Sequence, residues 1–148
     1  MRAIIQRVTS ASVSVDDTLV SQIGVGLLVL LGIKDDDTQK DQEYIAKKML
    51  NLRIFSDEQG KMNKSIQDIS GELLLVSQFT LYGDCRKGNR PSFVKAMPPQ
   101  KAEVFYNAFV EHVRKIYPRV KEGAFGAYMQ VTLVNDGPVT ILIDSQKP

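Results

Sequence analysis

The sequence predicts an α+β fold. Residues 1–148 are expected to form a single domain, a curved, mostly antiparallel β-sheet or barrel with two main helices packed on it. Three observations favour this class. Apolar and β-branched stretches of strand length recur along the chain, only two stretches have helical periodicity, and strands do not alternate strictly with helices as in a doubly wound sheet. The 148 residues contain no internal repeat or linker, and a chain of this length buries roughly 68–70% of its unfolded surface.

The first half of the chain predicts a hairpin, a central strand and a helix. The strands are expected at 3–15, 19–23 and 24–33, with a turn at 16–18. The helix is expected from about Thr38 to Leu50, because the run 35–38, Asp-Asp-Asp-Thr, offers N-cap candidates and negative charge at its start. Its buried positions recur at i, i+4 and i+7; they are Ile45, Met49 and Leu52.

The second half predicts short strands around one longer helix. A strand at 52–55 returns through a turn at 57–60 to residues 61–62, and 72–76 forms the next strong strand. A polar loop at 84–90 precedes a helix that begins at Pro98 and Pro99 and ends near Tyr117, before Pro118. Closing strands are expected at 120–122, 129–135 and 139–144. The buried face of this helix is expected to be Ala102, Phe105, Phe109, Val113 and Ile116.

Composition excludes several classes of function. Cys85 is the single cysteine, so no intramolecular disulfide forms and a cytoplasmic location is expected. His112 is the single histidine, which argues against a zinc site, and no metal or other cofactor is expected. The N-terminus lacks signal-peptide features, and the longest apolar run, 23–33, is too short to span a bilayer, so no membrane association is expected. The net charge of +2 neither requires nor excludes a nucleic-acid partner.

The usual catalytic groups of hydrolases are missing. His112 lies within the predicted second helix, so neither a Ser-His-Asp nor a Cys-His system is indicated. The basic neighbours of Cys85 favour a lowered thiol pKa, but an incidental loop cysteine is the simpler interpretation. The aspartates at 16–17 and 35–37 stand where turns and helix caps favour this residue type. The remaining candidates for catalysis are hydroxyl groups and backbone N–H groups.

Two short segments place such groups at strand ends. Ser77, Gln78, Phe79 and Thr80 follow the apolar strand 72–76. They are either ordinary strand-end caps or a site in which backbone N–H groups form an oxyanion hole and the hydroxyls orient the substrate. The second segment is 135–140, Asn-Asp-Gly-Pro-Val-Thr, between two apolar runs. From the residues alone Gly137-Pro138 is a simple hairpin turn, with no reason to expect a cis peptide bond.

Two further segments suit contacts with RNA. Arg86, Lys87, Arg90 and Lys95 form a basic stretch that is either solvated or bound to phosphate. Phe125 and Met129 lie in a glycine-flexed segment, where they either pack in the core or form a platform for a base.

Taken together, four segments resemble the D-aminoacyl-tRNA deacylases, which clear D-amino acids from mischarged tRNA. They are residues 1–8 (MRAIIQRV), 77–81 (SQFTL), 88–93 (GNRPSF) and 135–140 (NDGPVT). The resemblance covers essentially the whole chain. It implies a hydrolase that cleaves the ester of D-aminoacyl-tRNA, and of glycine wrongly attached to tRNA, as a proofreading step in translation.

The resemblance also implies how the site is built. It implies a homodimer in which a cis Gly137-Pro138 bond reaches from one subunit into the pocket of the other, whose floor is Ser77, Gln78, Phe79 and Thr80. Gly137 and Pro138, with Val139 and Thr140, would bind substrate and reject an L side chain sterically, so that selectivity comes from rejection. Backbone N–H groups near Phe79 and Thr80 would hold the carbonyl oxygen, and the 2′-hydroxyl of the terminal adenosine would assist attack by water.

Some roles stay open at this stage. Thr80 is either a positioning residue or a nucleophile, although no base is evident beside it in the sequence. Arg7 either braces the Gly-Pro turn or belongs to the surface. Phe125 and Met129 are candidate contacts for the terminal adenine, and Arg86, Lys87 and Arg90 for the rest of the tRNA. The alternatives are an RNA-binding module without activity and a small-molecule esterase or amidase that uses Thr80 or Ser77 as its nucleophile.

Overall fold

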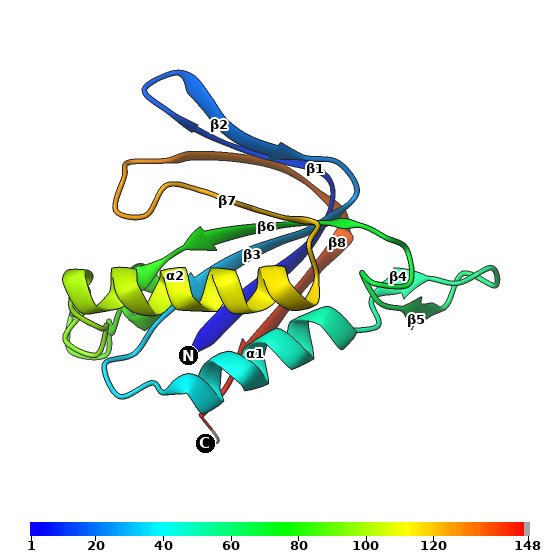
Figure 1. Cartoon of the computed structure of the whole chain (residues 1–148). Coiled ribbons are helices and arrows are strands. Elements are labelled where there is room, and N and C mark those ends of the chain that lie inside the picture. Colours follow the sequence, from blue (N-terminus) through cyan, green and yellow to red (C-terminus); the bar gives the residue numbers. More distant parts are fainter. Residues whose placement is uncertain (147–148) are drawn as a thin grey trace.

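The computed structural model describes residues 1–146, which form one six-stranded, strongly curved sheet with two helices on one side (Figure 1). The strand order is β2-β1-β3-β6-β7, and β8 pairs with the free side of β1. The β1–β2, β1–β3 and β1–β8 pairs are antiparallel, and the β3–β6 and β6–β7 pairs are parallel. The predicted α+β class with a curved, mostly antiparallel sheet is therefore confirmed.

The strands have the following bounds: β1 Arg2–Val15, β2 Thr18–Ile23, β3 Gly26–Gly32, β4 Phe55–Ser56, β5 Met62–Lys64, β6 Glu72–Ser77, β7 Val120–Glu122 and β8 Gln130–Asp144. β1 is the organising strand, because its first half pairs with β3, its second half with β2, and nearly its whole length with β8. β4 and β5 form a separate hairpin that projects from the body of the molecule (Figure 1). The strand expected at 52–55 is shorter than predicted, because pairing with β5 begins only at Phe55.

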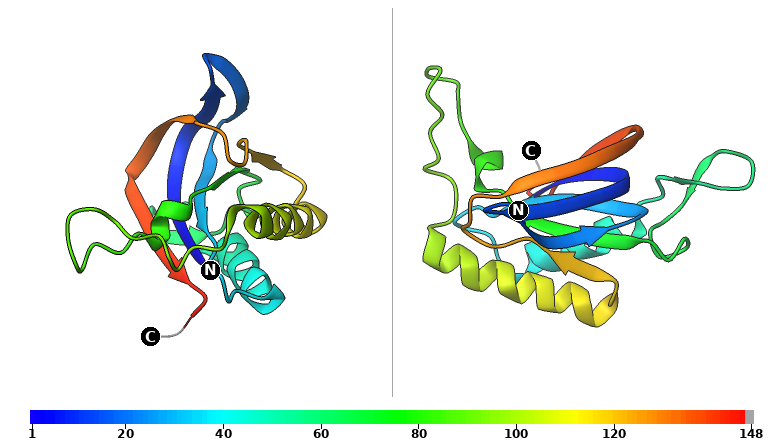
Figure 2. Two further views of the ribbon diagram at one scale, coloured as in Figure 1. Left: turned by 90° about the vertical axis from the view of Figure 1, so that its left-hand side faces the viewer. Right: turned by 90° about the horizontal axis from the view of Figure 1, so that it is seen from above.

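The helices are α1 Gln39–Asn51 and α2 Pro99–Ile116, and a 3-10 turn, η1, spans Phe79–Tyr82. Thr38 and Asp41 form the capping box that begins α1, and Pro99 opens α2. Both helices cover the same side of the sheet, as the two views of Figure 2 show. Their buried side chains are Gln42, Ile45, Ala46, Met49 and Leu50 in α1, and Ala102, Tyr106, Phe109, Val110 and Val113 in α2.

One expected position of the helix faces is corrected. Ile116 is 53% exposed, because it is the last residue of α2, where the helix passes beyond the core, and Tyr106 and Val110 take its place in the buried face. Leu52, the C-cap of α1, and Phe105 of α2 are half-buried and pack against the helix-side core.

The sheet has a hydrophobic cluster on each side. The larger one lies beneath the helices and includes Ile5, Leu31, Leu75 and Phe109. The smaller one, with Val8, Val13, Leu28 and Val76, lies inside the curve that β1, β2 and the first half of β8 make. Alternation along the strands separates the two sets, since successive side chains point to opposite faces.

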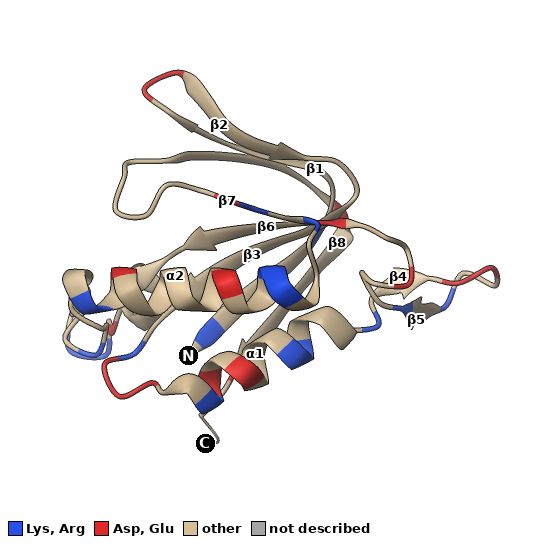
Figure 3. Ribbon diagram, viewed as in Figure 1, with Lys and Arg blue, Asp and Glu red and all other residues tan. Residues whose placement is uncertain are grey.

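Charged residues of both signs alternate along the helices, while Lys and Arg gather on the loop before α2 (Figure 3). Within residues 1–146, no helix is long and apolar enough to cross a membrane.

Candidate functional site

The first predicted motif lies where β6 ends and the chain turns. Ser77 is the last residue of β6 and pairs with Leu31 of β3. The Gln78 N–H donates to the Leu31 carbonyl oxygen at 2.7 Å, so Gln78 continues the ladder by one bond. The η1 turn then begins at Phe79 and folds over the end of β3, where a Cβ on Gly32 would lie 2.9 Å from Leu81 Cβ. Gly32 therefore allows the turn to pack closely on the sheet.

The η1 turn leaves two backbone donors free. Leu81 N–H donates to the Gln78 carbonyl at 3.3 Å, and Gly83 N–H donates to the Thr80 carbonyl at 2.9 Å. The amides of Phe79 and Thr80 have no hydrogen-bond acceptor within the described part of the chain, as expected for the first residues of a helical turn. The site therefore offers two adjacent N–H groups at the surface.

Side chains fix the groups around these amides. The Gln78 side-chain amide donates to Thr80 Oγ1, and Thr80 itself is exposed. The Phe79 ring is 57% exposed and meets the Phe93 ring edge-on, with centroids 5.0 Å apart. Phe93 belongs to the segment 88–93, so this contact brings two of the predicted motifs together.

The second predicted motif is a bulge within one strand. β8 runs without a break from Gln130 to Asp144, so the two strands and hairpin turn expected here are corrected. Thr140 pairs with Gln6 and Asn135 with Val8, which leaves four residues of β8 opposite Arg7 alone. The Gly137-Pro138 bond within this bulge is cis, and both residues are exposed. Gly137 has φ +130°, a conformation that favours glycine.

Arg7 and Asn135 hold this bulge in place. Arg7 Nε donates to the Asp136 carbonyl at 3.0 Å, and Arg7 Nη1 donates to the Ile54 carbonyl at 2.6 Å. Asn135 Oδ1 accepts from the Val139 N–H at 2.9 Å, while its Nδ2 donates to Thr140 Oγ1 at 2.9 Å. Between these braces, the Val139 side chain is buried in the helix-side core and Thr140 is exposed.

The two motifs lie far apart in one chain. The bulge is level with Arg7, which pairs with Leu27, and Leu27 pairs with Leu73. Ser77 is four residues further along β6, which is about 13 Å, and three strand spacings separate β8 from β6, which is about 14 Å. The direct separation is therefore about 20 Å. Figure 1 agrees, since β6 ends at the left of the view and β8 bends at the right.

The candidate RNA contacts occupy two different environments. Arg86, Lys87 and Arg90 are exposed on the loop after η1. A forked hydrogen bond from Arg86, strengthened by the Arg86 backbone N–H, holds the pKa of the Asp84 carboxyl far below its ordinary range. Phe125 and Met129 are half-buried: the Phe125 ring packs against Tyr106 at 5.5 Å, and Met129 Sδ accepts from the Ala124 N–H at 3.4 Å.

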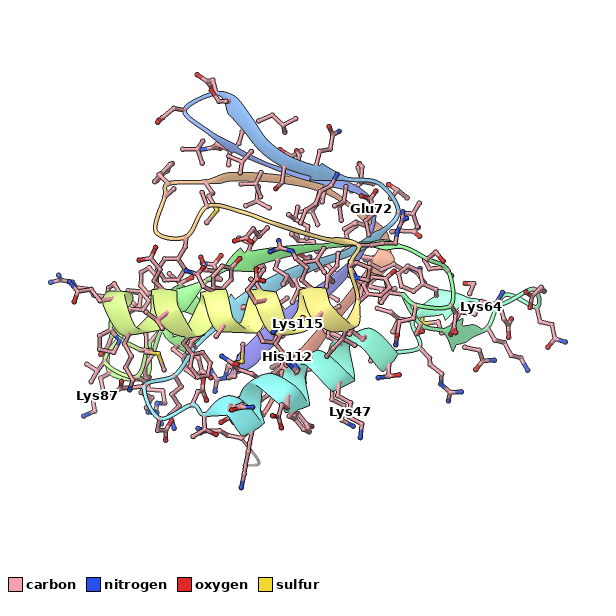
Figure 4. The ribbon with its side chains drawn as sticks, viewed as in Figure 1. Lys47, Lys64, Glu72, Lys87, His112 and Lys115 are labelled. Carbon is pink, nitrogen blue, oxygen red and sulfur yellow. The ribbon has the colours of Figure 1, made fainter. Side chains whose placement is uncertain are left out.

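The two residue types that usually attract catalytic hypotheses lie elsewhere. His112 lines a groove of about 650 Å³ between α1 and α2, on the helix side of the sheet (Figure 4). Cys85 is exposed in the loop beside Asp84. Neither side chain belongs to the turn after β6.

Comparison with known proteins assigns the chain to a family. Residues 4–144 match the family model described as D-Tyr-tRNA(Tyr) deacylase. The chain belongs to this deacylase family. It is 57% identical to a D-aminoacyl-tRNA deacylase of Clostridium acetobutylicum over 147 residues, and 58% identical to one of Thermosipho africanus, with 99% of both chains covered in each case. The expected resemblance is confirmed, and with it the expectation of a hydrolase.

Solved structures agree with the deacylase fold. A protein titled c-Myc DNA unwinding element binding protein superimposes with a TM-score of 0.95 at 53% identity, covering 99% of this chain and 100% of that one. A probable eukaryotic D-amino acid tRNA deacylase superimposes with a TM-score of 0.83 at 19% identity, covering 96% of this chain and 97% of that one. The second likeness shows that the deacylase fold is shared at low sequence identity.

Sequence reasoning missed two groups that shape the candidate site. Asn135 is part of a predicted motif but has no predicted role, although an Asn side chain close to a turn is a common brace for it. Arg2 was not singled out, yet its Nη1 donates to the Leu81 carbonyl at 3.0 Å and its guanidinium lies 4.7 Å from the centre of the Tyr82 ring. No local sequence signal pairs residues 2 and 82.

Proposed function

We propose that this protein hydrolyses the ester that joins a D-amino acid, or a misattached glycine, to tRNA, as a proofreading step of translation in the cytoplasm. The observation that carries the proposal is the open turn after β6, where the amides of Phe79 and Thr80 point to no acceptor within residues 1–146. The names of the relatives, which are 57–58% identical over nearly the whole chain, support the same substrate class.

These amides suit an oxyanion hole. In ester hydrolysis water attacks the carbonyl carbon, negative charge develops on the carbonyl oxygen, and the 3′-oxygen of the terminal ribose leaves with a proton. One preorganised donor of this kind contributes roughly 2.7–4 kcal/mol in a hydrolase. The aminoacyl ester is already activated, and the neighbouring 2′-hydroxyl can assist the water. Positioning and charge stabilisation then suffice, without a histidine base.

Thr80 takes a positioning role in this proposal. Its Oγ1 accepts a hydrogen bond from the Gln78 side-chain amide. An amide N–H is a donor and takes no proton from a hydroxyl, so Gln78 is not the base that a threonine nucleophile requires. The hydroxyl hydrogen of Thr80 remains available to orient the substrate or the water, with Ser77 at the strand end beside it.

Chiral selection requires a second copy of the chain. The Gly137-Pro138 backbone and the turn after β6 lie about 20 Å apart in one chain, too far to contact the same α-carbon. A two-fold symmetric homodimer brings the bulge of each subunit into the pocket of the other, since such an interface is reciprocal. Phe79, Val134 and Leu142 are each more than half exposed and offer apolar surface for it.

In that arrangement the bulge excludes L-amino acids by shape. The backbone of Gly137 and Pro138, held by Arg7 and Asn135, faces the amino group and α-carbon of the substrate. An L side chain would collide with this backbone, whereas a D side chain points away and glycine has none. Thr140 supports the bulge through its bond to Asn135, and Val139 anchors it in the core.

The remaining predicted residues contact the tRNA. Arg86, Lys87 and Arg90 are exposed on a loop adjoining the turn, where they suit phosphate contacts. Phe125 and Met129 lie in the segment that follows β7, and Gly123 of that segment donates to the Leu75 carbonyl two residues before Ser77. The terminal adenine therefore has an aromatic ring and a thioether near the end of β6 on which to stack.

The test is a paired deacylation assay with D-Tyr-tRNA and L-Tyr-tRNA, without added metal. Wild-type protein should cleave the D-ester only, and Gly137→Val should abolish cleavage, because a Cβ at this position would lie 2.9 Å from both Arg7 Nη2 and Val139 Cγ2. Gly60→Val is the matched control, since Gly60 also has positive φ, at +78°, but nothing lies near its Cβ position.

Each outcome has a clear consequence. Selective loss of the D-ester, retained in Gly60→Val and absent in a folded Gly137→Val, supports the proposed function. Loss of both esters at the rate without enzyme would overturn it and leave a binding protein. Cleavage of simple esters without tRNA, with covalent labelling of Thr80 or Ser77, would favour a small-molecule esterase instead.

A further inference from the structure

A second cleft lies beside the η1 turn, and Arg86 is the one residue of its lining that has a part in the function proposed above. Its volume is about 440 Å³, and it is formed by the beginning of β1, the end of β8, the chain after β3 and the loop after η1. The charged and aromatic side chains of the lining are Arg2, Lys34, Tyr82, Asp84, Arg86, Lys95 and Asp144.

The lining of this cleft carries excess positive charge. Two of its four cations are neutralised by the two carboxylates of the lining: Arg2 Nε donates to Asp144 at 2.7 Å, and Arg86 is paired with Asp84. The other two cations are Lys34, which is paired with Asp36 outside the lining, and Lys95. Lys34 Nζ lies 2.8 Å from the Gln146 side-chain oxygen and 3.0 Å from an exposed carboxylate of Asp36. The Lys95 side chain is exposed and makes no hydrogen bond or ion pair within residues 1–146. The cleft therefore suits an anion of low charge.

Tyr82 lines the same cleft and has an unpaired buried hydroxyl. Its side chain is 4% exposed, and its hydroxyl has no hydrogen-bond partner in the described chain. Burial raises the pKa of Tyr82, so the phenol stays protonated and remains a donor. Buried polar groups are rarely left unpaired in native structures. The hydroxyl has almost no accessible surface, so what Tyr82 offers to the cleft is its ring, which lies 4.7 Å from the Arg2 guanidinium.

The cleft is one short turn away from the proposed ester site. The η1 turn has Phe79 and Thr80 at its start and Tyr82 at its end, and the three steps from Phe79 to Tyr82 cover about 6 Å at roughly 2 Å each. Gly83, a wall of the cleft, donates to the Thr80 carbonyl at 2.9 Å, and Arg2 holds the Leu81 carbonyl. A ligand that spans both places is about one nucleotide long.

The geometry points to this cleft as the binding site for the phosphodiester backbone next to the terminal nucleotide of the tRNA. The inference rests on the proposed function, because the ester must sit at Phe79 and Thr80. Lys95, the cation of the lining without an ion pair, neutralises the phosphodiester, and Lys34 adds a second ammonium group beside it. Such contacts position the strand without reading its sequence, since phosphate groups are the same at every nucleotide.

Three substrates separate the cleft from the ester site. They are 3′-O-D-tyrosyl-adenosine, which has no phosphodiester, D-tyrosyl-CpA, which has one, and D-Tyr-tRNA. The primary variant is Lys95→Gln, followed by Lys34→Gln combined with it. Lys47→Gln is the matched control, an exposed lysine of α1 that lies far from Lys87 and its loop in Figure 4.

Lys95→Gln should raise KM for D-tyrosyl-CpA and D-Tyr-tRNA roughly fivefold, the upper range for an exposed charge pair, with kcat unchanged. The slope of log KM against the logarithm of the salt concentration should decrease by about one, as expected for the loss of one phosphate contact. The adenosine ester should be cleaved with unchanged KM, the double variant should show a larger effect, and Lys47→Gln should show none. Unchanged melting temperatures exclude loss of folding as the cause.

Failure of this inference and failure of the proposed function look different. Wild-type protein that cleaves none of the three esters overturns the function. A second result overturns the phosphodiester site alone. In it, wild-type protein cleaves all three esters, and the KM values of Lys95→Gln and of the double variant are either unchanged or raised as much for the adenosine ester as for the other two. Inorganic phosphate is a further probe. If it protects wild type against thermal unfolding but not Lys95→Gln, and KM for D-tyrosyl-CpA is the same in both, then free phosphate is the ligand and the phosphodiester site is also overturned.

Discussion

Asn135 should control the activity of the Gly-Pro bulge without contacting the substrate. Its side chain makes two hydrogen bonds across the bulge, to the Val139 N–H and to Thr140 Oγ1, both at 2.9 Å. Leucine is similar in volume but offers neither donor nor acceptor. In Asn135→Leu the partly buried Val139 N–H loses its acceptor, and the bulge loses the crosslink that closes it.

The size of the effect follows from those two bonds. Each hydrogen bond contributes about 0.5–1.5 kcal/mol, so the native bulge loses roughly 1–3 kcal/mol relative to other local conformations. Since 1.4 kcal/mol corresponds to a factor of ten, kcat/KM for D-Tyr-tRNA should fall between about fivefold and a hundredfold. Asn135→Asp should retain most of the activity, because one carboxylate oxygen accepts from Val139 and the other accepts from the Thr140 hydroxyl.

The assay compares kcat/KM for D-Tyr-tRNA, and the ratio of D- to L-ester cleavage, in wild type and in both variants. Asn63→Leu is the control: Asn63 donates to Asp57 at 2.8 Å in the β4–β5 hairpin, away from the site. Asn135→Leu that is folded, fully active and as selective as wild type would refute the reasoning. Equal losses in Asn135→Leu and Asn63→Leu would show a general effect on stability instead.

Four more outcomes are expected. Thr80→Ala should lose about tenfold or less in kcat, because a positioning hydroxyl is removed; a loss of roughly a thousandfold or more, measured by single-turnover deacylation, would favour a nucleophile. His112→Ala should cleave D-Tyr-tRNA at the wild-type rate, since His112 lies between the helices, and a changed pH–rate profile would contradict this. Phe109→Ala should reduce the free energy of unfolding by about 3–5 kcal/mol, because Phe109 is fully buried; urea denaturation measures this, and a loss below about 1 kcal/mol would contradict it. The depressed pKa of Asp84 means that its bond to Arg86 is present above the unfolded-state pKa of about 3.9 and is lost as pH falls through the lower folded value. Nuclear magnetic resonance signals of Arg86 should therefore stay constant between about pH 5 and 8 and shift only in strong acid, and a shift near neutral pH would contradict it.

The order of strands and helices was predictable because local patterns determine it. The capping residues at Thr38, the prolines before α2 and the apolar strands each act within a few residues. The β8 bulge was not predictable from the residues alone, because its three extra residues become visible only in the register with β1. Ile116 fits the helical period, but its exposure depends on where the core ends, which periodicity does not specify.

The candidate site shows the same division between local and distant effects. The strand end at Ser77 and the exposed turn after it follow from local sequence. The contact of Phe79 with Phe93, and of Arg2 with the η1 turn, join residues far apart in the chain, and only the tertiary structure reveals them.

β1 sets the distance between the η1 turn and the β8 bulge. Arg2 at its start holds the turn of the proposed ester site, and Arg7 holds the bulge that reaches the other subunit in the proposed homodimer. The five residues from one arginine to the other span about 17 Å, and the odd spacing places the two side chains on opposite faces. Inserting or deleting one residue here would reverse that relation and turn the strand's core residues outward. In the proposed mechanism, the length and pleat of a single strand therefore set the distance between ester cleavage and chiral selection.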